Sequence, residues 1–221
     1  NAFHGRTSAA VAATDTPKII APLNAQQKVI FLEFGDEKGL VETLSKGDVC
    51  AVIIEAIQGV GGLDMPTQKF MKLVEKSCHE NNTCLIADEV QSGFGRSGKF
   101  FAYQHYNITP DIISMAKGMG NGFPVGGILA HPNIKPWYGM LGTTFGGNHL
   151  ACQASLAVLE VLKKKKLMEH ATKLGEAFIK RAENIPGVKK VKGRGLMLGL
   201  EFDFEVGEMR KKLIYEHQIF T

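Results

Sequence analysis

The chain has 221 residues, enough for one sizeable domain or for one domain and part of a second. Hydrophobic residues make up 44% and charged residues 22%, as in ordinary soluble globular proteins, and a net charge of +4 from scattered lysines argues against a nucleic acid partner. No apolar stretch is long enough to span a membrane and no signal peptide is recognisable, so we expect a cytoplasmic protein with no membrane partner.

The cysteines point to the same compartment. They stand at Cys50, Cys78, Cys84 and Cys152, and none belongs to a C-x-x-C pair. Three of them fall in apolar patterns. We therefore expect buried, reduced thiols in a reducing compartment.

The first part of the chain alternates apolar runs with helix-sized segments. The expected strands cover residues 29–34, 49–57, 83–88, 111–116 and 126–130. The expected helices cover residues 7–14, 36–46 and 66–80, the last with Pro66 as its first residue. This alternation predicts an α/β fold with a mostly parallel sheet and helices on both of its faces.

The pattern changes after residue 147, where Asn148 is a candidate N-cap for a long helix. The elements expected beyond it are helices over 167–184 and 205–217 and strands within 188–202. They predict a small α+β domain over residues 166–221, cut short, after a large domain over residues 1–165. Because the chain begins without Met and stops in a strand-like segment, we expect a fragment of a longer protein.

Two chemically useful side chains stand at the ends of apolar strands. Asp88 ends one strand, and Lys117 directly follows the next and precedes a glycine-rich segment. Ligands of α/β proteins bind at the carboxyl ends of strands. A desolvated lysine has a lowered pKa and attacks carbonyl carbons, and pyridoxal phosphate enzymes need such a lysine together with an acid for the pyridine nitrogen. The alternative interpretation is a surface lysine and a solvated loop acid.

Five motifs follow one another along the chain. They are the segments Phe3–Thr7, Glu55–Gly59, Ile86–Gly98, Pro110–Gly118 and Thr143–Asn148. In this order they resemble the class III aminotransferases, and within them the acetylornithine aminotransferases. The resemblance implies the fold type I of pyridoxal-phosphate-dependent transferases, with residues 1–165 as the cofactor-binding large domain, incomplete at its N-terminal side. It also implies a homodimer whose two subunits share each active site.

The resemblance assigns cofactor contacts to the segment around Asp88. Lys117 would form the Schiff base with pyridoxal 5′-phosphate, and Asp88 would pair with the pyridine nitrogen. Gln91 would contact the ring hydroxyl, and Glu89 and Val90 would line the same turn.

It assigns four further residues. Phe3 would stack on the cofactor ring, as an aromatic side chain can. Arg6 would bind the substrate α-carboxylate with its guanidinium fork. Thr144 would contact the cofactor phosphate from the neighbouring subunit, and Thr143 would reach towards substrate. Taken singly, these residues also fit core packing, a surface arginine and an ordinary turn.

The sequence departs from the family pattern in two ways. Ala56 replaces a proline, and Val60 replaces a second glutamate that in relatives pairs with a C-terminal arginine. The family's phosphate-binding turn, which precedes the Phe3 motif, is also absent from the chain.

The resemblance implies transamination between a small-molecule amino donor and a 2-oxo acid. The donor would be N-acetylornithine or N-succinylornithine, reacting at its terminal amine, and the acceptor 2-oxoglutarate, in arginine biosynthesis. Val60 leaves open another class III enzyme that acts on ornithine, 4-aminobutyrate or a diamine. The absent phosphate-binding turn leaves open a catalytically incompetent fragment or pseudo-enzyme.

Overall fold

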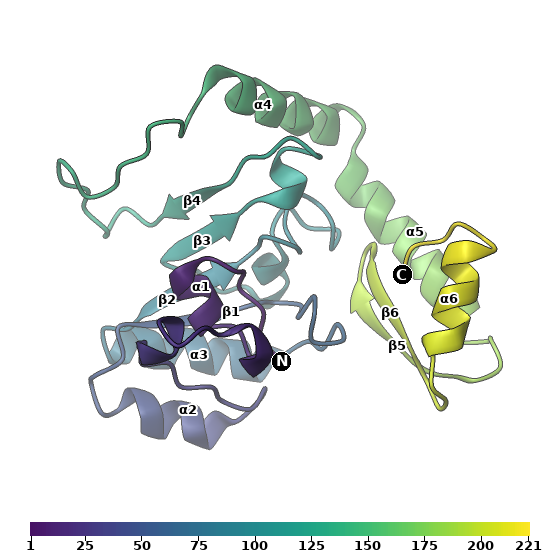
Figure 1. Ribbon diagram of the computed structural model, residues 1–221, viewed down its shortest axis with the longest axis horizontal. Coiled ribbons are helices and arrows are strands. Elements are labelled where there is room, and N and C mark those ends of the chain that lie inside the picture. The colour runs from purple at the N-terminus through teal and green to yellow at the C-terminus, as the bar shows by residue number, and fades with distance from the viewer.

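The computed structural model describes residues 1–221, and its centre is a four-stranded sheet (Figure 1). The strands lie in the order β1 (Ala51–Ile54), β2 (Cys84–Asp88), β3 (Ile112–Met115) and β4 (Gly127–Ala130). The first three are parallel and β4 runs antiparallel to β3. The prediction of an α/β fold with a mostly parallel sheet is confirmed.

Helices α2 (Glu37–Leu44) and α3 (Gln68–Glu80) supply much of the core. Leu40 and Leu44 of α2 pack with Met71 and Val74 of α3 and with Leu85 of β2, and each of these five side chains is nearly solvent-free. Leu40 and Leu44 are four residues apart, and Met71 and Val74 are three apart. Residues at these spacings share one face of a helix, and here that face is turned to the protein interior. The core therefore anchors β2 and, with it, the position of Asp88.

Short polar side chains cap the first turns of α2 and α3. Asp36 accepts a hydrogen bond from the backbone of Gly39 at 2.8 Å, and Thr67 accepts one from Phe70 at 3.1 Å. Each thereby satisfies a backbone N–H that the first helical turn leaves free. The expectation that Pro66 is the first residue of its helix is wrong, because Thr67 takes the capping position and Pro66 precedes it.

The C-terminal part consists of α4 (His149–Lys164), α5 (Leu167–Ala182), the antiparallel hairpin β5 (Val188–Arg194) and β6 (Met197–Phe202), and α6 (Gly207–Tyr215). Asn148 caps α4 as predicted, accepting a hydrogen bond from Ala151 at 3.0 Å. Figure 1 shows α4 beyond β4, and α5, α6 and the hairpin at one side of the sheet. The division into domains at residue 165 stays a prediction.

Smaller elements complete the chain. They are the five-residue helix α1 (Ser8–Ala12) and 3₁₀ turns at Pro17–Ile19, Asn24–Gln26, Ala102–Tyr106 and Lys117–Met119. None of the helices is both long enough and apolar enough to cross a lipid bilayer.

The strand expected over residues 29–34 is wrong. This segment forms neither a strand nor a helix, and Ile30 is 59% exposed. A strand needs hydrogen-bonded neighbours, and the sheet ends at β1 with no strand paired on its outer side. An apolar run by itself is therefore not sufficient to predict a strand.

The expectation of buried thiols is wrong for two of the four cysteines. All four are free, but Cys50 and Cys152 are exposed, while Cys84 is half-buried and Cys78 is buried. Burial, together with the nearby charge of Asp111, raises the pKa of Cys78 to about 12. Cys152 is exposed because the outer face of α4 is apolar yet uncovered, with Leu150 70% exposed.

Candidate active site

The parallel register brings the predicted acid and lysine to one edge of the sheet. Asp88, the last residue of β2, lies opposite Ser114 of β3, and Lys117 follows three residues later. Lys117 has a φ of 40°, in the left-handed region that side chains other than glycine rarely adopt. Strained backbone of this kind is found at functional sites, which agrees with a functional role for Lys117.

The carboxylate of Asp88 is buried and held by three donors. The His4 ring nitrogen Nδ1 lies 2.7 Å from Oδ2, while the Ser114 hydroxyl and the Val90 backbone N–H donate to Oδ1 at 3.0 and 3.1 Å. Burial raises the pKa of Asp88, but the hydrogen bonds from His4 and Val90 outweigh it and hold the pKa below its ordinary value. Asp88 is therefore a fixed negative charge at neutral pH.

His4 is a site residue that the sequence analysis missed. It stands within the Phe3–Thr7 motif, but its contact with Asp88 spans 84 positions and no local pattern announces it. Its backbone is held as well, since the N–H of His4 donates to the Thr14 hydroxyl at 3.0 Å.

A second buried carboxylate ties the N-terminal segment to the loop after β1. Glu55 accepts from the backbone of Phe3 at 3.3 Å and from that of Gly59 at 3.0 Å. Burial raises the pKa of Glu55 above its ordinary value, although both backbone hydrogen bonds lower it. Gly59 in turn lies against Gln91, because a Cβ on Gly59 would meet the Gln91 amide oxygen at 2.0 Å.

Glu89 points into the protein and organises the turn after β2. It is 1% exposed and accepts from the Ser92 hydroxyl at 2.7 Å and from the backbones of Ala102 and Tyr103 at 2.9 and 2.7 Å. Burial raises the pKa of Glu89 above its ordinary value. The side chain thus links the turn that carries Val90 and Gln91 to the 3₁₀ segment at residue 102, while cofactor contacts by Glu89 and Val90 stay predictions.

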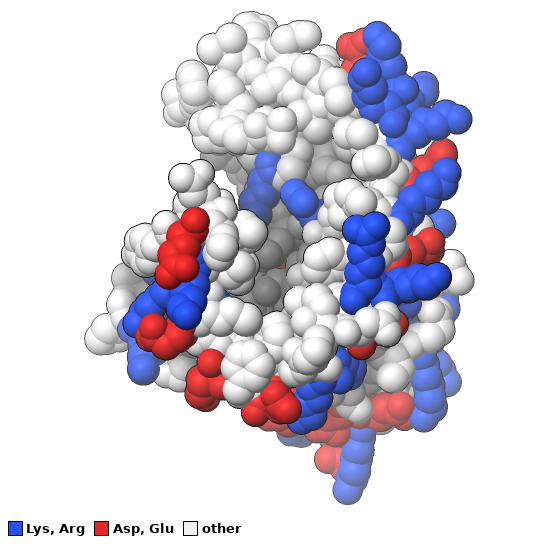
Figure 2. Space-filling view, turned by 90° about the vertical axis from the view of Figure 1, so that its right-hand side faces the viewer, with Lys and Arg blue, Asp and Glu red and all other residues white.

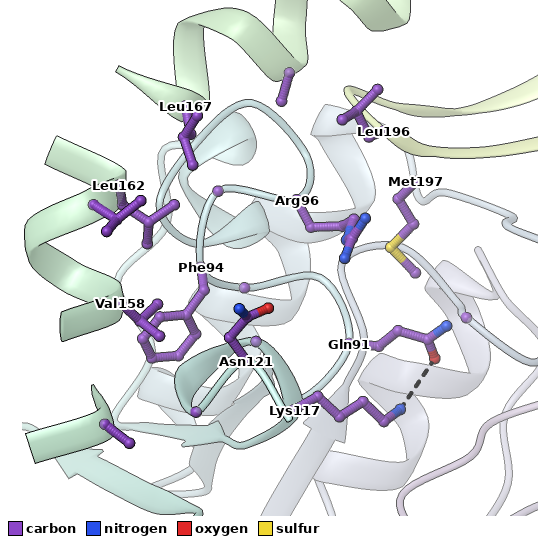
Figure 3. A pocket seen from close by; sticks show the side chains of 18 of the residues that line it. Gln91, Phe94, Arg96, Lys117, Asn121, Val158, Leu162, Leu167, Leu196 and Met197 are labelled. Carbon is purple, nitrogen blue, oxygen red and sulfur yellow. Dashed lines mark hydrogen bonds between the residues drawn. The ribbon is translucent and has the colours of Figure 1, made fainter. Parts of the chain in front are cut away.

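Lys117 and Gln91 open onto a cavity of about 930 Å³ (Figure 3). The Lys117 ammonium lies 3.5 Å from the Gln91 amide oxygen, a long hydrogen bond. The expectation of a desolvated Lys117 is wrong, because the side chain is solvent-exposed at the cavity wall. The cavity is also lined by Arg96, Asn121 and apolar residues of α4, α5 and the hairpin, among them Val158, Leu162, Leu167 and Met197.

The other predicted site residues do not line this cavity. Phe3 is half-buried beside Glu55, and Arg6 is exposed. Thr143 and Thr144 are exposed in the loop between β4 and α4, which Figure 1 shows extending away from the hairpin. The Thr143 hydroxyl accepts from the backbone of Gly146 at 3.1 Å, as in an ordinary turn. The roles of these four residues stay predictions.

The sequence is similar to one family along almost its whole length. The family described as Aminotransferase class-III matches residues 1–218. The acetylornithine aminotransferase of Caldanaerobacter subterraneus subsp. tengcongensis is 42% identical over 93% of this chain and 53% of its own length. That of Methanocaldococcus jannaschii is 39% identical over 97% of this chain and 55% of its own length. The chain therefore spans about half the length of these curated relatives.

The fold is similar to solved aminotransferases. The ornithine aminotransferase of Toxoplasma gondii superimposes with a TM-score of 0.89 at 31% identity, covering 100% of this chain and 55% of that one. The acetylornithine aminotransferase of Elizabethkingia anophelis gives a TM-score of 0.77 at 36% identity, covering 86% of this chain and 51% of that one. The similar structures thus include one named for ornithine and one named for acetylornithine.

Proposed function

The chain belongs to the class III aminotransferases, and we propose that it carries the catalytic centre of a pyridoxal-phosphate-dependent aminotransferase. The observation that supports this most is the presence of an ionised acid and an exposed amine at the same edge of the sheet. Asp88 and Lys117 stand at the carboxyl ends of adjacent parallel strands, and Lys117 opens onto the cavity. The residues present therefore supply two of the groups that the cofactor needs, an amine for the aldehyde and an anion for the ring nitrogen.

Pyridoxal phosphate, when bound, supplies an aldehyde that condenses with amines and a ring that withdraws electrons. The carboxylate of Asp88 would stabilise the positive charge of a protonated ring nitrogen by its own opposite charge. His4, Ser114 and the backbone of Val90 keep that carboxylate ionised and oriented. Lys117 would hold the cofactor through its amine, and its free Nζ would take the proton from the amine-bearing carbon of the substrate and deliver it to the cofactor. Gln91 orients that nitrogen through its amide oxygen.

We propose N-acetylornithine or N-succinylornithine as the donor and 2-oxoglutarate as the acceptor, as in arginine biosynthesis. The support is the name shared by the curated relatives at 42% and 39% identity. Arg6 would bind the donor α-carboxylate. Ornithine is the second candidate donor, because the Toxoplasma gondii ornithine aminotransferase has a TM-score of 0.89 and because Val60 replaces the glutamate that sets acceptor handling in relatives.

We also propose a cytoplasmic homodimer with a shared active site. The loop that carries Thr143 and Thr144 is exposed and rich in uncovered apolar side chains, with Trp137 67% and Phe145 75% exposed. Figure 2 shows a broad uncharged area at the level of α4. Exposed apolar area of this kind is typical of a surface that another protein surface covers.

The proposed activity is tested by cofactor binding and amine transfer together. Added pyridoxal phosphate should give a visible absorption band that Lys117→Ala abolishes and Lys135→Ala, at an exposed loop lysine, retains. Transfer to 2-oxoglutarate should then be fastest from acylated ornithine, compared with ornithine, 4-aminobutyrate and a diamine. Equal rates would contradict the proposed donor, and the absence of any band would support a catalytically incompetent chain.

A further inference from the structure

Arg96 is a cation of the cavity wall whose side chain has no partner within the protein. No hydrogen bond or ion pair involves its guanidinium, although the side chain is exposed within the cavity that Lys117 and Gln91 also line. Figure 3 shows the three side chains directed into the same space, with Leu196 and Met197 nearby. The positive charge of Arg96 therefore faces the cavity, and no acidic side chain of the protein neutralises it.

The backbone of Arg96 is nevertheless held firmly. Its carbonyl oxygen accepts from the N–H of Leu196 at 2.9 Å, and its own N–H donates to Gly93 at 3.4 Å. Gly195 packs so closely that a Cβ there would lie 2.7 Å from the same carbonyl oxygen. The turn after β2 and the tip of the β5–β6 hairpin therefore fix where the guanidinium enters the cavity.

The cavity is cationic. Among its 21 lining residues Lys117 and Arg96 are basic and none is Asp or Glu. The three nearby acids are already engaged, Asp88 by His4, Glu89 by Ser92 and two backbone donors, and Glu55 by the backbones of Phe3 and Gly59. Figure 2 shows a hollow on this side of the molecule with Lys or Arg side chains on its wall. A concave surface with uncompensated charge of one sign concentrates ligands of the other sign.

We propose that Arg96 binds a carboxylate of the substrate, with the reacting end of that substrate at Lys117. This rests on the proposed aminotransferase function. A guanidinium presents two parallel N–H donors that match the two oxygens of a carboxylate. The apolar residues of α4, such as Ala157 and Val158, offer a surface for the aliphatic chain between the two ends. The substrate class is therefore a 2-oxo acid that carries a second carboxylate, with 2-oxoglutarate as the test ligand.

The test compares a carboxylate substrate with a substrate that lacks one. In the protein loaded with pyridoxal phosphate, Arg96→Gln should raise the KM for 2-oxoglutarate by about tenfold or more, the loss expected for a charged hydrogen bond. Arg96→Lys should recover part of the loss because it keeps the charge and loses the fork. The KM for a carboxylate-free diamine and the visible cofactor band should stay unchanged. Arg181→Gln, at an exposed position on α5 outside the cavity, is the matched control.

Suppose that Arg96→Gln shows the cofactor band and its KM for 2-oxoglutarate stays within twofold of wild type. This result would overturn the role of Arg96 and leave the proposed aminotransferase function standing. A weaker band with unchanged 2-oxoglutarate KM would also overturn the role of Arg96, because the anion would then be the cofactor phosphate. A wild-type protein without the band would contradict the proposed function instead.

A binding measurement extends the test to protein without turnover. By calorimetry the wild-type chain should bind glutarate at least about tenfold more tightly than uncharged glutaramide. Equal binding of the two compounds would overturn the proposal.

Discussion

The charge of Asp88 in the candidate active site depends on three neighbouring hydrogen-bond partners. The carboxylate is 6% exposed, and burial alone would raise its pKa. The hydrogen bonds from His4, Val90 and Ser114 reverse that effect. A negative charge is therefore available at the end of β2 without an ion pair to a lysine or arginine.

Replacing His4 tests this balance. His4→Phe removes the donor, whereas His4→Gln retains one and is the matched control. Because the folded-state pKa of Asp88 lies below the ordinary 3.8, its ionisation stabilises the fold above that pH and the stabilisation is lost as pH falls through the folded-state pKa. In His4→Phe that pKa rises, so the free energy of unfolding at neutral pH should fall by about 1.5–3 kcal/mol and the acid-induced loss should begin at a higher pH.

Chemical denaturation at several pH values measures both effects. A His4→Phe profile that parallels the wild type, with no shift on the acid side, would contradict the role assigned to His4.

The β5–β6 hairpin and the turn after β2 form the contact that shapes the cavity. Gly195, at the hairpin tip, has a φ of 58°, and a Cβ there would lie 2.5 Å from the carbonyl carbon of Ser97. Atoms cannot approach this closely, so the hairpin would have to move away from the turn. Glycine is thus required at this position by both conformation and space.

We expect Gly195→Ala to destabilise the fold by about 1–3 kcal/mol, since added bulk forces backbone shifts in packed regions. Gly207→Ala is the control, because it lies in α6 with no atom within 4 Å of the added carbon, and alanine there should be neutral or stabilising. The urea midpoint of each variant gives the comparison. Equal midpoints for the two variants would show that the hairpin does not depend on close packing at its tip.

The strands that contribute to the core could be predicted from their apolar sequences. The apolar runs at β2 and β3 are buried on one face and half-buried on the other, so their sequences mark the strands and the residues that follow these runs, Asp88 and Lys117. The run over residues 29–34 is equally apolar but has no neighbouring strand. Whether a run forms a strand therefore depends on pairing that only the tertiary structure supplies.

The positions of Asp88 and Lys117 at the ends of neighbouring strands follow from the chain order, whereas the long-range contacts of the candidate site do not. The pairing of His4 with Asp88 and the exposed setting of Lys117 depend on packing between distant segments. Arg96 lies within a motif whose sequence gives no sign that its side chain enters a cavity. Packing between elements, and not local pattern, decides these features.

At the level of the whole molecule, loops at the sheet and the C-terminal elements form opposite walls of the open cavity that Lys117 lines. Lys117, Gln91 and Arg96 come from loops at the sheet, while the opposite wall comes from α4, α5 and the hairpin (Figure 3). Large apolar surfaces on α4 and its preceding loop are uncovered, with Leu141 74% and Leu150 70% exposed. Both properties suit a chain that spans about half the length of its curated relatives and, as proposed, pairs with a second copy.

The position of cofactor attachment is the most direct measurement of the proposed function. The protein is incubated with pyridoxal phosphate, reduced with borohydride and digested, and the modified peptide is located by mass spectrometry. We predict modification at Lys117, because it alone among the lysines lines the cavity and follows the strand next to Asp88. Modification confined to an outlying lysine such as Lys99, or no modification at all, would contradict the assignment of this site.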